Sequence, residues 1–347
     1  MMRQYLEIKS RNADSILFFR MGDFYEMFLD DAVVASRILD ITLTSRNKGG
    51  ADEIPFCGVP FHSAQPYIAK LIEAGYRVAI CEQVEDPKQA RGIVKRDVVR
   101  VVTPALVTES ESLVPEENSF LLAACNSGNL WGLAWLDLST GEFKASSADG
   151  ITAVSALAAS ISPKEILLSE KLRTELPREL ANATGERPKS YIADWVIDRD
   201  YVTQLICRQF GVASPEMLGL GADSGQALFA AGMVLHYLKE SRHSTLPHLR
   251  EIQIVRKNDH LALDPATRRN LELTANMCDG RKTGSLLGSL DKTVTSMGAR
   301  MLKQWVSYPL VQVAPLRRRL DAVEELKDHS SLLESLRTEL REVHDLE

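Results

Sequence analysis

Residues Met21–Phe28, with the sequence MGDFYEMF, place aromatic side chains on both sides of one carboxylate. Phe24 and Tyr25 directly precede Glu26. An aromatic ring can stack on a flat ligand, and a neighbouring carboxylate can accept a hydrogen bond from the edge of that ligand. The neighbouring Gly22 would also let another backbone come close. This stretch is therefore a candidate ligand-contacting site.

The same stretch has a purely structural interpretation. Asp23 and Glu26 have the spacing of a capping box, in which Glu26 would bond back to the backbone at the start of a helix from about Phe24 to Leu39. At about 100° per residue, Phe24 falls on the apolar face of that helix, which favours burial in a core over ligand contact. In the first helical turn, however, the Phe24 side chain can also project past the helix end. Both interpretations stay open at this point.

The elements around this motif predict an α/β first segment. The apolar run SILFF, which precedes the motif, is typical of a strand. A second helix is predicted from about Ala64 to Ala74, with Ser63 as its N-cap and Gly75 just past its end. The runs YRVAICEQV and VVRVVTPALV are predicted strands. The motif therefore belongs to a small domain that we place at residues 1–107.

Composition divides the remainder of the chain. The acidic, proline-containing stretch TESESLVPEEN predicts a linker, placed at residues 108–118. Hairpin-like strands and then alternating helices and strands follow, which predicts a second α/β domain at residues 119–244. The pattern over residues 245–347 is mainly helical and predicts the beginning of an all-α domain. Its last helix, SSLLESLRTELREVHDLE, is predicted to reach Glu347 without a stop signal, which suggests a piece of a longer chain.

Charge and composition exclude several classes of protein. The formal net charge of the 347 residues is −6, which argues against a bulk polyanion binder, and residues 1–107 hold 14 basic and 14 acidic residues. A nucleic-acid surface must then be a local patch. No apolar run is long enough to span a bilayer, and the polar N-terminal stretch does not have the pattern of a secretory signal. The five scattered cysteines form no C-x-x-C pair, which favours reduced thiols in the cytoplasm over a zinc site.

Motifs for catalysis are weak in this sequence. The pattern G-x-x-x-x-G-K-[ST] does not occur, so these residues hold no phosphate loop of that type. The stretch GLGADSG at Gly219–Gly225 lacks the spacing and the preceding strand of a dinucleotide fingerprint. Asp137, in AWLDLSTG, is a candidate nuclease carboxylate at a strand end, but a metal nuclease needs further converging carboxylates. Arg268 and Arg269 are interpreted as a solvated helix face or a domain-interface pair.

The motif and several later segments resemble one family, in order along the chain. RMGDFYEMFLDDA is similar to the mismatch-sensing motif of the MutS family of bacterial DNA mismatch-repair proteins. The segments IPFCGVPFHSAQPYIAKLIEAGYRVAICEQVEDP, TLPHLREI, DPATRRNLEL and LDKTVTSMGARMLKQWVSYPL continue the resemblance. It implies a mixed-sheet mismatch-recognition domain of the α/β class, a ribonuclease-H-like connector, also α/β, and the start of an all-α core and lever domain.

The resemblance also implies roles for individual residues. The family motif F-x-E falls on Phe24 and Glu26. The phenylalanine would insert into the minor groove beside a mispaired or unpaired base and kink the duplex, and the glutamate would contact the displaced base. Candidate supporting DNA contacts are Met21, Arg46, Lys48 and His62. The implied partners are mismatched double-stranded DNA, a second copy of the chain in a homodimer and a MutL-type repair protein, in the cytoplasm at the nucleoid and away from membranes.

The predicted function of these residues is binding and not catalysis. The ATPase of the family, with its ATP and Mg²⁺, is expected outside them, and no cofactor or metal is expected within them. Two alternatives remain: a structure-selective, metal-dependent nuclease that uses the connector sheet with Asp137 as a metal ligand, and a MutS paralogue that acts on recombination intermediates. The intact F-x-E pair argues against the paralogue, because such a protein has no need of a mismatch sensor.

The purified 347-residue chain is expected not to hydrolyse ATP, because its sequence contains no phosphate loop. Release of inorganic phosphate, compared with a control that lacks the protein, checks this. Turnover above that control would contradict a function restricted to binding.

Overall fold

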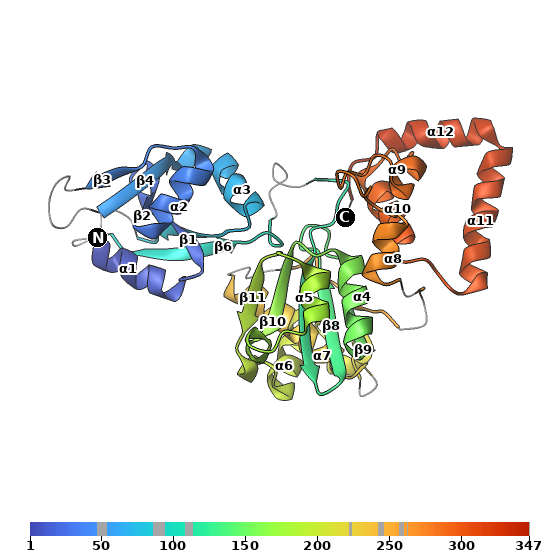
Figure 1. Cartoon of the computed structure of the whole chain (residues 1–347), viewed down its shortest axis with the longest axis horizontal. Coiled ribbons are helices and arrows are strands. Elements are labelled where there is room, and N and C mark those ends of the chain that lie inside the picture. Colours follow the sequence, from blue (N-terminus) through green and yellow to red (C-terminus); the bar gives the residue numbers. More distant parts are fainter. Residues whose placement is uncertain are drawn as a thin grey trace. The chain divides into compact units, whose positions relative to one another are not determined.

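The computed structural model describes residues 1–46, 54–85, 94–107, 114–221, 224–241, 246–256, 260–261 and 263–346 (Figure 1). Lys48, one of the candidate DNA contacts, lies outside these ranges. The chain forms two compact units: Met1–Val107 with Tyr237–Thr245, and Thr108–His236 with Leu246–Glu347. Two mixed α/β sheets are followed by helices, which confirms the predicted fold class. No helix in the described ranges is long and apolar enough to cross a membrane.

The first unit is built on a six-stranded mixed sheet with the order β3-β4-β2-β1-β5-β6. The strands are β1 (Ser15–Met21), β2 (Phe24–Phe28), β3 (Thr44–Arg46), β4 (Ile54–Pro60), β5 (Arg77–Gln83) and β6 (Arg96–Val102). The helices are α1 (Met2–Arg11), α2 (Asp30–Leu39) and α3 (Gln65–Glu73), with a 3₁₀ turn at Phe61–Ser63. Strand β1 pairs antiparallel with β2 and parallel with β5, so the sheet is mixed at its centre.

Helix α1 covers one face of this sheet. Tyr5 packs edge-on against Phe28 and Phe19, with ring centroids 5.0 and 5.6 Å apart, in a cluster of buried residues from α1 and four strands. The Tyr5 hydroxyl donates to the buried carboxylate of Asp31 at the start of α2 (3.2 Å). Lys9 of α1 forms an ion pair with the same carboxylate (2.8 Å). These contacts fix α1 over the Phe28 end of β2.

Helix α2 packs on the opposite face of the sheet. Strand β2 pairs with β4 so that Met27 lies opposite Cys57, and both side chains are buried. The Cys57 thiol donates to the carbonyl oxygen of Ala32 in α2 (3.5 Å). Because side chains alternate along a strand, Phe24, Glu26 and Phe28 must point to the α1 face. The side chains of β2 therefore alternate between the α1 face and the α2 face of the sheet.

The predicted helix from Phe24 to Leu39 is wrong in its first third. Residues Phe24–Phe28 form strand β2, and α2 begins only at Asp30. The chain turns back at Gly22, whose φ of +59° suits a tight hairpin, and β2 then pairs with β1 and β4. Glu26 consequently does not cap a helix. Pairing on both sides of β2 outweighs the helical spacing of its apolar residues.

The helix predicted at Ala64–Ala74 is confirmed as α3, with Gly75 at a φ of +84° just past its end. The predicted cap is wrong, because the N-cap is Ala64 and no side chain caps the helix. The strands predicted from SILFF, YRVAICEQV and VVRVVTPALV are confirmed as β1, β5 and β6.

The second unit contains a six-stranded sheet with the order β11-β10-β7-β8-β9-β12. Its strands are β7 (Leu121–Ser127), β8 (Leu130–Leu136), β9 (Phe143–Asp149), β10 (Glu165–Ser169), β11 (Lys189–Ile192) and β12 (Gln253–Ile254), with helices α4 (Ile151–Ile161), α5 (Arg178–Thr184), α6 (Arg199–Phe210) and α7 (Ala227–Glu240). Strands β7, β8 and β9 form an antiparallel meander, and β10 and β11 add parallel to β7. This part of the chain therefore has the α/β class that the sequence predicts.

The last part of the chain is helical, as predicted. Its helices are α8 (Pro265–Asn270), α9 (Leu286–Leu290), α10 (Ser296–Ser307), α11 (Val313–Asp328) and α12 (Ser330–Arg341). The prediction that the last helix continues to Glu347 is wrong, because α12 ends at Arg341. The apolar stripe of α12 remains exposed at Leu332, Leu336 and Leu340.

Replacing Phe28 with alanine is expected to lower the free energy of unfolding of the first unit by about 3–5 kcal/mol, because the ring is fully buried against Tyr5. Phe24→Ala is expected to cost less than about 1 kcal/mol, because about half of this residue is exposed and it lies outside the buried cluster. Native-state hydrogen exchange of the β1 amides measures both values. Similar costs for the two variants would place Phe24 in the core.

Candidate nucleic-acid interface

Phe24 lies at the tip of the β1–β2 hairpin. It pairs with Met21 across the two-residue turn Gly22-Asp23, and with Pro60 of β4 on its other side. The backbone N–H of Phe61 donates to the carbonyl oxygen of Asp23 (3.0 Å), which ties the turn to the chain after β4. Although both of its strand neighbours are in place, the Phe24 side chain is 47% exposed. A paired backbone thus presents an aromatic ring to solvent.

Glu26 projects from the same face of β2 as Phe24. Residues two apart in a strand are separated by about 7 Å, so one flat ligand can touch both side chains. Tyr25, between them, points to the opposite face, where it is buried against Phe18 (5.7 Å between centroids) and donates to Glu82. The F-x-E spacing therefore puts the ring and the carboxylate side by side and uses the intervening residue as an anchor.

An arginine holds the Glu26 carboxylate. Arg46 of β3 forms an ion pair with Glu26 (Nη2 to Oε2, 2.7 Å), and its guanidinium lies 5.2 Å from the centroid of the Phe28 ring. Gly58 is the β4 residue opposite Glu26, and a Cβ added there would lie 3.5 Å from Glu26 Cγ. Burial raises the pKa of Glu26, and Arg46 lowers it without cancelling that rise. The site thus contains a partly desolvated carboxylate with one cationic partner.

Met21 and His62, two other predicted DNA contacts, differ in their exposure. Met21 is half-buried and packs against the cluster beneath α1, whereas His62 is exposed and lies edge-on to the Phe61 ring (5.8 Å between centroids). Sequence reasoning did not single out Phe61 or Arg20. The Arg20 guanidinium stacks on Phe61 at 3.4 Å, and its Nε donates to the carbonyl oxygen of Gly22 (2.6 Å). The signal that was missed is the pairing of β4 with β2, which brings Phe61 to the hairpin.

Comparison with known proteins identifies the family. The model of MutS domain I matches residues 1–111, that of MutS domain II matches residues 119–250, and that of MutS domain III matches residues 266–347. The chain belongs to the MutS family. The DNA mismatch repair protein MutS of Myxococcus xanthus is 43% identical over 356 aligned residues, which cover 100% of this chain and 39% of that protein. The proteins of the same name from Halothermothrix orenii and Desulfatibacillum aliphaticivorans are each 42% identical, with the same coverage. The chain thus spans about 39% of the length of these MutS relatives.

The second unit of this MutS-family chain does not offer Asp137 to a metal. Asp137 is fully buried, and its carboxylate accepts from Asn118 Nδ2 (2.9 Å), Ser119 N (3.0 Å), Ser139 N (3.0 Å) and Ser139 Oγ (2.6 Å). Four bonds saturate the lone pairs of a carboxylate. Within the described ranges, no group of three His, Cys, Asp or Glu side chains could hold a metal ion. Asp137 therefore serves as a hydrogen-bond acceptor that joins loop and strand.

Arg46→Ala is expected to raise the pKa of Glu26, because it removes the charge that lowers this pKa and leaves the effect of burial. Arg37→Ala, which removes an exposed arginine from α2, is the matched control and should leave the Glu26 pKa in place. An NMR titration of the Glu26 carboxyl carbon measures both variants. An unchanged Glu26 pKa in Arg46→Ala would show that the ion pair does not form in solution.

Proposed function

We propose that the first unit recognises mispaired or unpaired bases in duplex DNA, with Phe24 as a wedge that enters the minor groove. The observation that carries this proposal is the exposed Phe24 ring, held at a hairpin tip on the same strand face as Glu26. Membership of the MutS family, whose relatives are named DNA mismatch repair proteins, supports it. In this proposal the second unit contains the connector and the first helices of the core domain.

Wedge insertion can distinguish mispaired from matched DNA, because a mispaired duplex is easier to deform. A ring that enters between base steps must unstack them and kink the duplex, which costs a few kcal/mol for each step. At a mispair the bases are already poorly stacked, so the same kink costs less there. One aromatic side chain can therefore serve many different mispairs without a separate pocket for each. A rigid hairpin is suited to this role, because the force needed to unstack a base would displace a flexible loop.

Glu26 supplies selectivity more than affinity in this proposal. The approach of a duplex brings phosphates near a carboxylate whose pKa burial already raises, and both effects favour the protonated form. A protonated carboxyl can donate a hydrogen bond to the edge of a displaced base. Over matched DNA, where no base is displaced, the ionised carboxylate repels the backbone and weakens binding.

Arg46 connects the two states of Glu26. In the free protein its guanidinium bonds to Glu26 at 2.7 Å. Phosphate oxygens compete for the same guanidinium, since arginine binds phosphates through charge-assisted bonds. When Arg46 turns to the DNA backbone, Glu26 loses the partner that keeps it ionised. Phosphate contact and protonation of Glu26 are thus coupled.

The activities of the whole protein are further proposals. We infer that the longer protein works as a homodimer, with an ATPase outside these residues and a MutL-type repair protein as a partner. The alternative of a metal-dependent nuclease is not favoured, because the Asp137 carboxylate is saturated with hydrogen bonds. A paralogue acting on recombination intermediates would have no use for the exposed Phe24–Glu26 pair.

Phe24→Ala is expected to abolish the preference of the chain for a duplex with one mispair over the matched duplex, while the fold persists. Tyr76→Ala is a matched control, because Tyr76 is 40% exposed and precedes β5 at the end of the sheet away from the hairpin. Fluorescence anisotropy with labelled duplexes measures the ratio of the two dissociation constants. Retention of the ratio in Phe24→Ala, or its equal loss in Tyr76→Ala, would contradict the wedge.

Glu26→Ala is expected to raise affinity for matched DNA and to change mismatch affinity little. It removes a base hydrogen bond, which contributes about 0.5–1.5 kcal/mol, together with an opposing phosphate repulsion. Salt screens that repulsion over about 10 Å at 0.1 M, so the gain on matched DNA should be largest at low salt. Glu26→Gln should behave similarly and keep more of the base contact. An unchanged ratio of affinities at two salt concentrations would contradict a discriminating role for Glu26.

A further inference from the structure

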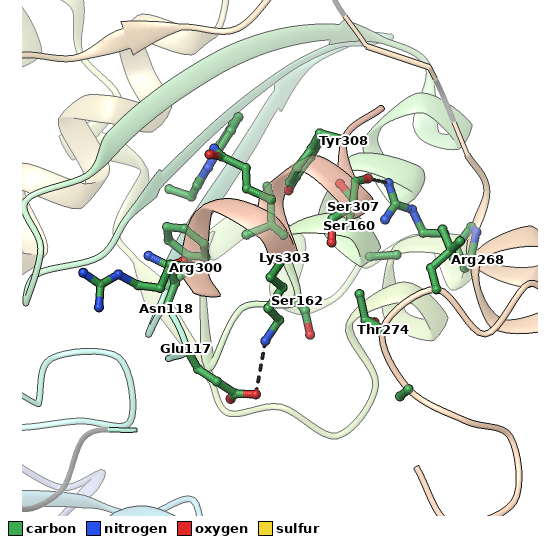
Figure 2. A pocket seen from close by; sticks show the side chains of 18 of the residues that line it. Glu117, Asn118, Ser160, Ser162, Arg268, Thr274, Arg300, Lys303, Ser307 and Tyr308 are labelled. Carbon is green, nitrogen blue, oxygen red and sulfur yellow. Dashed lines mark hydrogen bonds and ion pairs between the residues drawn. The ribbon is translucent and has the colours of Figure 1, made fainter. Parts of the chain in front are cut away.

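The second unit contains a cavity of about 600 Å³ that the proposed function does not use. Its wall combines residues of β8, the end of α4, the segment around α8, and α10. Figure 2 shows Lys303 extending from α10 toward Glu117, and Arg268 reaching Ser307 on another side. A volume of this size is typical of pockets that enclose a small organic ligand.

The cavity wall is strongly basic in a chain whose net charge is −6. Seven lysine and arginine side chains line it, against two carboxylates, Glu117 and Glu142. Two further carboxylates act as partners of lining residues: Asp291 pairs with Lys282 (2.5 Å), and Asp345 pairs with Arg300 through two bonds of 2.8 Å. With these partners counted, the lysines and arginines exceed the carboxylates by three among the described residues. The excess charge attracts an anionic ligand.

Two arginines at this wall have no carboxylate partner among the residues that the structure describes. Arg268 is half-buried, and it donates to the carbonyl oxygens of Leu263 (3.2 Å) and Ser307, both neutral acceptors. Burial lowers its pKa, as expected for a cation that is desolvated without a counter-ion. Arg269 is exposed. An anion in the cavity would supply a counter-charge to these arginines.

The remainder of the wall suits a flat, largely apolar group. Phe120, Trp135 and Tyr308 all line the cavity, and aromatic faces stack readily on planar rings. The Tyr308 hydroxyl is shielded from solvent and lies beside Ser160. The Ser160 hydroxyl donates to the carbonyl oxygen of Leu157 (2.7 Å). The aromatic side chains therefore make this part of the wall apolar.

We propose that this cavity binds an organic phosphate of nucleotide size, with its phosphate at Arg268 and Arg269 and its planar group against the aromatic wall. A planar group alone would leave the arginines without a counter-ion, and a free phosphate would leave most of the volume empty. This site is independent of the proposed mismatch recognition, because it uses no residue of the first unit.

Isothermal titration calorimetry of the 347-residue chain with ADP as the probe tests the site. Saturable one-to-one binding is expected, with competition by pyrophosphate and weaker binding of adenosine. Arg269→Glu should weaken ADP binding by about tenfold or more, the effect of losing a charge-assisted hydrogen bond. Arg250→Glu makes the same charge change at an exposed residue that does not line the cavity, and it should leave ADP affinity unchanged.

Three results would overturn the proposal. The first is the absence of saturable ADP binding up to millimolar concentrations. The second is equal weakening by Arg269→Glu and Arg250→Glu, which would indicate attraction to overall charge. The third is adenosine binding as tight as that of ADP, which would remove the phosphate from recognition. Mismatch binding by the same samples is a separate readout, so failure of one proposal is distinguishable from failure of the other.

Discussion

The candidate site depends on the pairing of β2 with strands on both sides. Because Met21 pairs with Phe24 across a two-residue turn, the direction of every later side chain in β2 is fixed. Phe24 and Glu26 must then share a face, and Tyr25 must anchor the other. A shift of one residue in this register would bury the ring and expose the anchor. The chemistry of the motif is thus a consequence of strand alternation and not of helix geometry.

The same face changes from core to surface within five residues. At one end of β2, Phe28 packs beneath Tyr5 of α1, and at the other end Phe24 is exposed. Glu26 lies between these environments, and its carboxylate is partly desolvated and balanced by Arg46. A carboxylate in that position is sensitive to new charges nearby, because one ion pair offsets its burial. The core on this face of the sheet therefore ends at Glu26, where the candidate binding surface begins. The charge of Glu26 depends on the charged groups that cover that surface.

Local patterns predicted much of the fold. Strands β1, β5 and β6, helix α3 and its terminal Gly75 follow from apolar runs and turn residues that are adjacent in sequence. Strand β2 was mistaken for a helix start, because Phe24, Tyr25 and Phe28 also fit a helical face. The correct signal was present: Gly22-Asp23 separates two apolar runs by two residues, which is typical of a hairpin. The predicted helix would expose Phe24 at a helix end, whereas the structure exposes it at a hairpin tip.

The surroundings of the site could not be predicted from sequence. Arg46 was a candidate phosphate contact, but its pairing with Glu26 requires β3 and β4 to bring residues 20 positions apart together. Arg20 and Phe61 stack only because the chain after β4 returns to the hairpin tip. Such contacts are set by strand order and not by local propensity. The basic cavity of the second unit likewise combines segments that are far apart in sequence.

The bend of bound DNA tests the central claim most directly, because a wedge must kink the duplex it enters. Energy transfer between dyes at the two ends of a duplex with one central mispair reports that bend. At saturating protein, the unmodified chain should bring the dyes closer on the mispaired duplex than on the matched one, and Phe24→Ala should remove this difference. Equal bending by Phe24→Ala, while it remains bound, would contradict the wedge.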